Sequence, residues 1–211
     1  MKIAATLAAL VALTGVSFGA SITVTNFRSA NTNLVADSSN TLIPNNSGYV
    51  AIGVFGADDA QLRTWASSLQ GAEIANAFVQ FSNNVSVGFN NFGGIYQTVI
   101  SGAISAGDSF AGQNVYTVIG NSSSLAGSSE LLVFKHNHVF MADPSPTANT
   151  VLMLDAEAGE AIIGISGENT ASLGPVIDQP TFQTVTVIPE PSSILLLLSG
   201  AGAFLLRRKR K

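Results

Sequence analysis

The stretch GYVAIGVF, residues 48–55, determines the fold that this sequence predicts. It is apolar on both faces of an extended chain, it contains β-branched and aromatic residues, and Gly56 ends it. A short apolar run of this kind is typical of a strand that is covered on both sides. We therefore expect residues 48–55 to lie in the middle of a β-sheet.

Further strands are expected on both sides of this stretch, because runs with a period of two recur along the chain. Turns rich in Gly, Asn, Ser and Pro separate these runs at the spacing of a sandwich or barrel. No internal repeat of fixed period occurs, which argues against a solenoid or propeller. The expected strands are residues 21–27, 85–89, 95–104, 115–119, 130–136, 139–142, 151–154, 161–165 and 182–188, and residues 28–47 are expected to form a polar loop.

A helical insertion is expected at residues 58–81. Asp58 and Asp59 can cap and charge the start of a helix. Apolar residues then recur at helical spacing, in one helix before Gly71 and in a second helix after it. These residues are Leu62, Trp65, Ala66, Leu69, Ile74, Phe78 and Phe81. The predicted body is therefore mainly β, an antiparallel β-sandwich of jelly-roll type with a small helical insertion.

The composition of residues 21–188 excludes several classes of function. They contain three cations, Arg28, Arg63 and Lys135, against twelve acids, which gives a net charge of −9. A basic footprint for nucleic acid is absent, and binding to anionic polymers by charge is not expected. The chain has no cysteine, which excludes thiol catalysis and thiolate metal sites.

His136 and His138 form a first candidate metal site. They are two positions apart, so on a strand their side chains point to the same face. Such a pair could bind a metal as in cupin-like proteins, but a third ligand is needed, and Asp143 lies beyond an expected turn. The alternative is that both histidines are polar residues at the tip of a hairpin.

Asp155, Glu157 and Glu160 form a second candidate, an acidic loop around Gly159. Such loops bind calcium in extracellular proteins, although the residue order of an EF-hand is not met. The alternative is an acidic turn between two apolar strands. No metal and no cofactor is assigned on these patterns.

No catalytic residue is assigned either. The Gly-x-Ser-x-Gly pattern of a serine hydrolase is absent. Trp65 fits the apolar face of a helix better than a sugar-stacking platform, and Tyr96 and Tyr116 lie in alternating strands where packing is the default. We therefore expect a protein that is not an enzyme.

The first twenty residues are typical of a signal peptide. Lys2 provides a positive start, residues 3–16 are apolar, and Ser17-Phe18-Gly19-Ala20 supplies small residues for cleavage. We expect export of the chain and removal of residues 1–20, which leaves residues 21–186 as the mainly β domain.

Residues 187–211 form the last expected unit, a tail with three parts. Pro189-Glu190-Pro191 is expected to be extended, because each proline fixes φ and lacks an N–H. Residues 192–206 are apolar or small, about 22 Å long as a helix, and are expected to enter the inner membrane. Five cations close the chain and favour the cytoplasmic side; they are Arg207, Arg208, Lys209, Arg210 and Lys211.

The order of these three parts resembles the PEP-CTERM sorting signal of Gram-negative bacteria that produce exopolysaccharide. The same tail is also catalogued as the C-terminal domain found on some ice-binding proteins. The resemblance implies recognition by an exosortase, a membrane-embedded enzyme similar to cysteine proteases, with removal of the tail and release or attachment at the cell surface. It covers about the last 25 residues, so it implies a location and a partner but no activity for the body.

The sequence therefore predicts an exported cell-surface or extracellular-matrix protein with a structural, adhesive or exopolysaccharide-associated role. Two alternatives stay open: an extracellular module that binds carbohydrate, calcium or ice, and a hydrolase of extracellular polymers. Ice binding requires a flat array of threonines, and the sequence offers only short pairs such as Thr23 with Thr25 and Thr184 with Thr186. A hydrolase requires a cleft with two close carboxylates.

Overall fold

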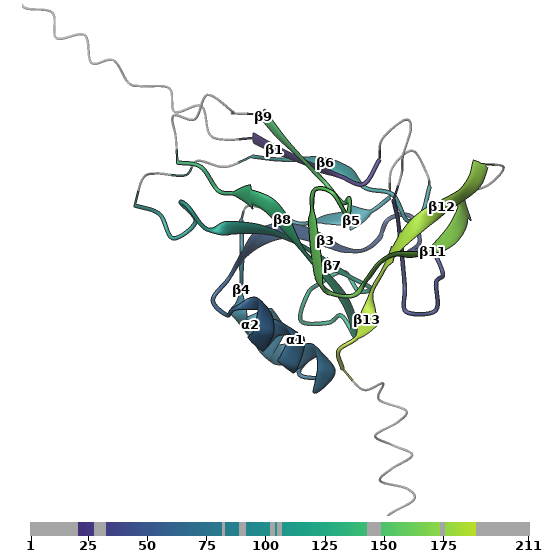
Figure 1. Ribbon diagram of the computed structural model, residues 1–211, viewed down its shortest axis with the longest axis horizontal. Coiled ribbons are helices and arrows are strands. Elements are labelled where there is room, and N and C mark those ends of the chain that lie inside the picture. Colours follow the sequence, from purple (N-terminus) through teal and green to yellow (C-terminus); the bar gives the residue numbers. More distant parts are fainter. Residues whose placement is uncertain are drawn as a thin grey trace, which may run out of the picture.

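The computed structural model describes residues 21–27, 33–81, 83–88, 92–101, 104, 107–142, 149–173 and 176–188. Within these residues the protein is mainly β, which confirms the predicted class (Figure 1). The helices are α1 (Asp59–Ser67) and α2 (Gly71–Ala77). The strands are β1 (Ser21–Thr25), β2 (Leu34–Ala36), β3 (Ser47–Phe55), β4 (Phe78–Gln80), β5 (Val85–Val87), β6 (Gln97–Ser101), β7 (Asn114–Gly120), β8 (Glu130–Val139), β9 (Asn149–Met153), β10 (Gly159–Ile163), β11 (Ile165–Leu173), β12 (Val176–Gln183) and β13 (Val185–Thr186).

The central sheet has the order β10-β8-β7-β3-β4, with β13 beside β8 and β5 beside β3. All of its pairs are antiparallel. β3 lies between β7 and the β4–β5 side, and every residue from Gly48 to Val54 is buried. The prediction that residues 48–55 form a central strand is therefore confirmed.

The alternation of side chains along β3 divides the buried residues into two cores. Val50 and Ile52 belong to a core shared with the smaller sheets. Ala51 belongs to the other core, where Leu62 of α1 and Ile74 of α2 are fully buried against the sheet. Both faces of the sheet thus bury apolar surface, which is the main favourable contribution to folding.

Two three-stranded sheets, β6-β1-β9 and β11-β12-β2, contribute to the first core. β1 pairs in parallel with β9, and β12 pairs in parallel with β2, so the prediction of a purely antiparallel body is wrong for these two pairs. Parallel partners need a long connection between them. Here the intervening chain forms the central sheet and its helices, and this separation in sequence hides the pairing from local patterns.

Two local predictions are also corrected. Helix α2 ends at Ala77, because Phe78 has extended dihedral angles (φ −82°, ψ 121°) and pairs with Phe55 of β3. The ring of Phe78 packs on that of Phe55 with centroids 5.1 Å apart, so tertiary packing overrides the helical spacing. Residues 130–136 and 139–142 were expected as two strands, but β8 runs unbroken from Glu130 to Val139 because β7 pairs along it.

Among the described residues, no helix is long and apolar enough to cross a bilayer. The expected signal peptide, residues 1–20, lies outside the described residues, and so do residues 189–211 of the expected tail. Arg28 and Asp143 lie outside them as well.

Candidate functional site

One row of paired residues crosses the central sheet beneath the start of helix α1. Gly53 of β3 pairs with Tyr116 of β7, Tyr116 pairs with Lys135 of β8, and Lys135 pairs with Glu160 of β10. Directly paired residues point to the same face of a sheet. Tyr116 packs in the core between the sheet and the helices, so this row faces α1.

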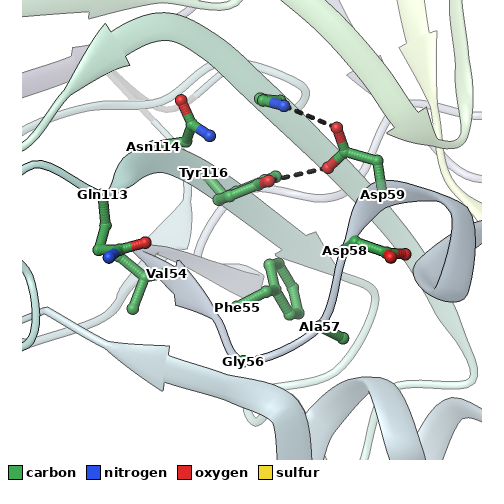
Figure 2. Close-up of a pocket in the computed structure, with 10 residues that line it drawn as sticks. Val54, Phe55, Gly56, Ala57, Asp58, Asp59, Gln113, Asn114 and Tyr116 are labelled. Atoms are coloured by element: carbon green, nitrogen blue, oxygen red, sulfur yellow. Dashed lines mark hydrogen bonds and ion pairs between the residues drawn. The ribbon is translucent and has the colours of Figure 1, made fainter.

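Helix α1 begins with two aspartates that have different partners. Asp58 is the N-cap, and its side chain accepts a hydrogen bond of 2.7 Å from the backbone N–H of Gln61. Asp59 reaches the sheet: its Oδ1 accepts from the Tyr116 hydroxyl at 2.8 Å, and its Oδ2 accepts from Lys135 Nζ at 2.6 Å (Figure 2). An acid in the first turn also interacts favourably with the helix dipole.

These contacts determine the protonation states of Asp59 and Tyr116 at neutral pH. Burial alone would raise the pKa of Asp59, but hydrogen bonds from Lys135 and Tyr116 and the charges of Lys135 and Arg63 outweigh it and lower that pKa. Burial and the hydrogen bond to Asp59 raise the pKa of Tyr116 above its usual range. Asp59 is therefore ionised and Tyr116 is protonated at neutral pH, and both pKa values are shifted away from neutrality.

A second ion pair lies one turn further along α1. Arg63 pairs with Glu160 of β10 and also donates to the carbonyl of Ile162 at 3.2 Å. Arg63 and Lys135 are the only two cations among the described residues, and both join α1 to the sheet. Acids far outnumber cations in residues 21–188, yet both of these cations lie between α1 and the sheet. Their placement indicates that the two ion pairs position the helix.

A pocket of about 340 Å³ opens beside this row, and we call it the Asp59 pocket. Figure 2 shows Gln113 and Asn114 on one side of it, Asp58 and Asp59 on the other, and Phe55 between them. Its volume is at the small end of the range for ligand pockets, about 300–1,000 Å³. The lining residues are Val54, Phe55, Gly56, Ala57, Asp58, Asp59, Gln113, Asn114, Tyr116 and Lys135.

A second pocket, of about 400 Å³, has no charged side chain in its lining. Tyr49 and Gln80 lie in it and are hydrogen-bonded to each other. Burial raises the pKa of Tyr49 to about 12, so its hydroxyl stays protonated. The lining residues are Tyr49, Ala75, Asn76, Phe78, Gln80, Asn84, Ser123, Ser124, Leu125 and Ala126.

The two histidines lie within β8 and not at a hairpin tip. His136 is buried, its Nε2 is 2.7 Å from the hydroxyl of Thr117, and its ring packs edge-on against Phe134. Its Nδ1 is buried without a hydrogen-bond partner. Burial, with a smaller contribution from the charge of His138, lowers the pKa of His136 to about 3. The imidazole is therefore neutral at physiological pH.

The acidic residues of the second candidate site do not converge. The Asp155 side chain accepts a hydrogen bond of 3.0 Å from the backbone N–H of Glu157 and so closes its own turn. Glu160 faces α1 and pairs with Arg63. Within the part of the chain that the structure describes, no three His, Cys, Asp or Glu side chains are grouped as a metal site.

The residues of the Asp59 pocket were not recognised as a site from the sequence. Asp59 could be read as a helix-capping residue, and Tyr116 as a packing residue. Only the strand register reveals that Tyr116 and Lys135 are neighbours, and local patterns do not encode register. No family model, curated protein or solved structure matches this chain.

Proposed function

We propose that this chain is an exported bacterial surface or matrix protein with a structural or adhesive role and no enzymatic activity. In this proposal residues 1–20 direct export, and the tail holds the protein at the inner membrane until an exosortase processes it. The body, which we interpret as a sandwich of jelly-roll type, then remains at the cell surface or outside the cell.

The observation that carries the proposal is the packing of the chain just before Pro189. Val187 is fully buried, its N–H donates to the carbonyl of Ser129 at 2.8 Å, and its carbonyl accepts from the N–H of Gly71 at 2.9 Å. The N–H of Ile188 also donates to Ser129. The packed body therefore extends at least to Ile188, and the Pro-Glu-Pro segment follows immediately.

This arrangement supports the division into body and sorting tail, with the boundary two residues later than the expected boundary after residue 186. A processing enzyme needs an extended peptide that does not belong to a folded unit. Pro189 and Pro191 favour such a conformation, because neither can donate a backbone hydrogen bond. Cleavage after Ile188 would leave every contact of Val187 in place.

The chemistry of the Asp59 pocket supports a role without catalysis. Asp59 is held ionised by its two donors, and Tyr116 is held protonated by burial and by its hydrogen bond to Asp59. Neither group has a pKa moved towards neutral pH, where general acid–base catalysis is most efficient. A pocket of fixed donors and acceptors is suited to binding, which favours the second candidate function, an extracellular ligand-binding module.

Intact mass of the protein from its native host tests the proposal, measured in strains with and without the exosortase. We expect a species that lacks residues 1–20 and ends between Pro189 and Ser192 only when the enzyme is present. A species that retains Lys211 in both strains would contradict exosortase processing and leave a membrane anchor. The variant Glu190→Ala should reduce processing, and Glu73→Ala, an exposed acid on α2, is the matched control.

A further inference from the structure

The Asp59 pocket has unused hydrogen-bonding groups in its lining. The side chains of Gln113 and Asn114 are exposed and have no hydrogen-bond partner in the described structure. An amide side chain offers both donors and an acceptor. Lys135, which also lines the pocket, uses one of its three ammonium hydrogens on Asp59, and the others remain available.

The charges around the pocket disfavour an anionic ligand. The ammonium of Lys135 is neutralised by Asp59 at 2.6 Å, and Asp58 adds a further exposed carboxylate. Residues 21–188 carry a net charge of −9, so the surrounding field also repels anions. A ligand that binds here must be neutral or cationic.

The position of the groups favours a ligand with hydroxyls on both edges and an apolar face. The ring of Phe55 lies between the amide side and the carboxylate side of the pocket (Figure 2). Phe55 is only partly buried, and it is held by an edge-on contact with Tyr116 at 5.2 Å. A pyranose ring has hydroxyls at its rim and C–H groups on its faces, so it matches this combination of polar sides and an aromatic surface.

The polar groups on the α1 side of the pocket are positioned before any ligand arrives. Asp59 is held by Tyr116 and Lys135, and Asp58 is held by its capping bond to Gln61. Groups that are fixed in the free protein lose little conformational entropy on binding. The second pocket differs, because Tyr49 and Gln80 there already satisfy each other.

We infer that the Asp59 pocket binds a neutral sugar unit of an extracellular polysaccharide, through Gln113 and Asn114 on one side, Asp58 on the other, and the free ammonium hydrogens of Lys135. The inference rests on the proposed function in one respect, since an exported body is exposed to such polymers. Uronic acids and other anionic sugars are excluded by the charge of the site.

Affinity electrophoresis of the purified full chain tests the inference, with native gels that contain dextran, galactan or mannan, and polygalacturonate as the acidic probe. We expect at least one neutral polymer to slow the protein and polygalacturonate to have no effect. The double variant Gln113→Ala/Asn114→Ala should weaken the binding by about tenfold or more, since it removes two hydrogen-bonding side chains. Both residues are exposed, so the variant should fold normally.

The matched control is Asn84→Ala, an exposed amide that lines the second pocket. It should bind like the unchanged protein. Migration unaffected by all three neutral polymers, stronger retardation by polygalacturonate, or equal losses in the two variants would each overturn the inference. Mass spectrometry of processing is independent of this result: a processed chain that binds no sugar refutes only the pocket, and an unprocessed chain that binds refutes only the sorting.

Discussion

Lys135 of β8 and Asp59 of α1 are 76 residues apart in the sequence, and their Nζ and Oδ2 atoms are 2.6 Å apart in the structure. Both side chains are partly shielded, with exposed fractions of 29% and 31%. The ion pair joins the helices to the sheet at the edge of the candidate binding pocket. Its strength therefore affects both stability and the geometry of the pocket.

A double-mutant cycle with Asp59→Asn and Lys135→Met should detect this ion pair. Each single change leaves the other charge without its partner, so each should lower the free energy of unfolding by about 1 kcal/mol. The double variant should lose less than the sum, by about 0.5–1 kcal/mol, and this coupling should shrink as salt is added. Urea denaturation gives the values. Glu73→Gln, on the exposed face of α2, is the control, and additive single effects would show that the pair contributes nothing.

The buried imidazole of His136 predicts that the protein loses stability in mild acid. Its pKa is lowered from 6.5 to about 3 by burial, so the unfolded chain binds a proton that the folded chain does not. The contribution of neutral His136 to the free energy of unfolding is fully present above pH 6.5. It decreases as the pH falls from 6.5 towards about 3, by up to about 1.4 kcal/mol per pH unit. Asp59 has a lowered pKa too, but its contribution is lost only below its ordinary value of 3.8.

Urea denaturation at several pH values between 6.5 and 4 checks this expectation on the unchanged protein and on His136→Gln. Glutamine can keep a hydrogen bond to Thr117 and does not titrate. The slope of the free energy of unfolding against pH should therefore fall by the amount that corresponds to about one bound proton. Thr117→Val is the matched control, because it removes the same hydrogen bond and leaves the imidazole. Equal slopes for the unchanged protein and His136→Gln would refute the assignment.

The sequence predicted the parts of the fold that depend on local periodicity. Residues 48–55 were identified as a central strand from their apolar run, and Asp58 was identified as a helix cap. It missed β2 and β4, which have three residues each and form only because a neighbouring strand pairs with them. It also missed most of β11, whose residues are largely polar and so lack an alternating pattern.

The candidate site could not be predicted, because it depends on pairing between distant strands. Tyr116 and Lys135 face each other only in the observed register of β7 and β8, and a register shifted by one residue would turn one of them to the other face. The sequence drew attention to the adjacent His136, which is buried and neutral in the core. The scarcity of cations was the one usable signal, since both described cations pair with acids on or facing α1.

Gly53 is required by close packing in the row beneath α1. A Cβ at this position would lie 2.2 Å from the carbonyl oxygen of Val79 and 2.8 Å from the ring of Phe78. The backbone of β4 cannot yield without breaking its pairing with β3. Gly53→Ala should therefore destabilise the protein by about 1–3 kcal/mol. Gly107→Ala is the control, because no atom lies within 4 Å of the added Cβ, and thermal unfolding of the two variants gives the comparison.

The end of the packed body can be located with two fragments, residues 21–188 and residues 21–186. Val187 is fully buried beside Gly71, and its backbone makes two hydrogen bonds to the body. Burying a valine side chain contributes about 1.5–3 kcal/mol, and each hydrogen bond contributes about 0.5–1.5 kcal/mol. We expect the fragment 21–188 to fold and the fragment 21–186 to be less stable by about 2.5–6 kcal/mol.

Val187→Ala in the fragment 21–188 separates the two contributions, because it removes apolar contacts and keeps the backbone hydrogen bonds to Ser129 and Gly71. Its loss should be smaller than that of the fragment 21–186, by about the contribution of those two bonds together with the contacts of Ile188, which the shorter fragment also lacks. Equal stability of the two fragments would place the end of the body before Val187. Failure of the fragment 21–188 to fold, while the full chain folds, would show that the tail belongs to the folded unit and would remove the main support for a separate sorting signal.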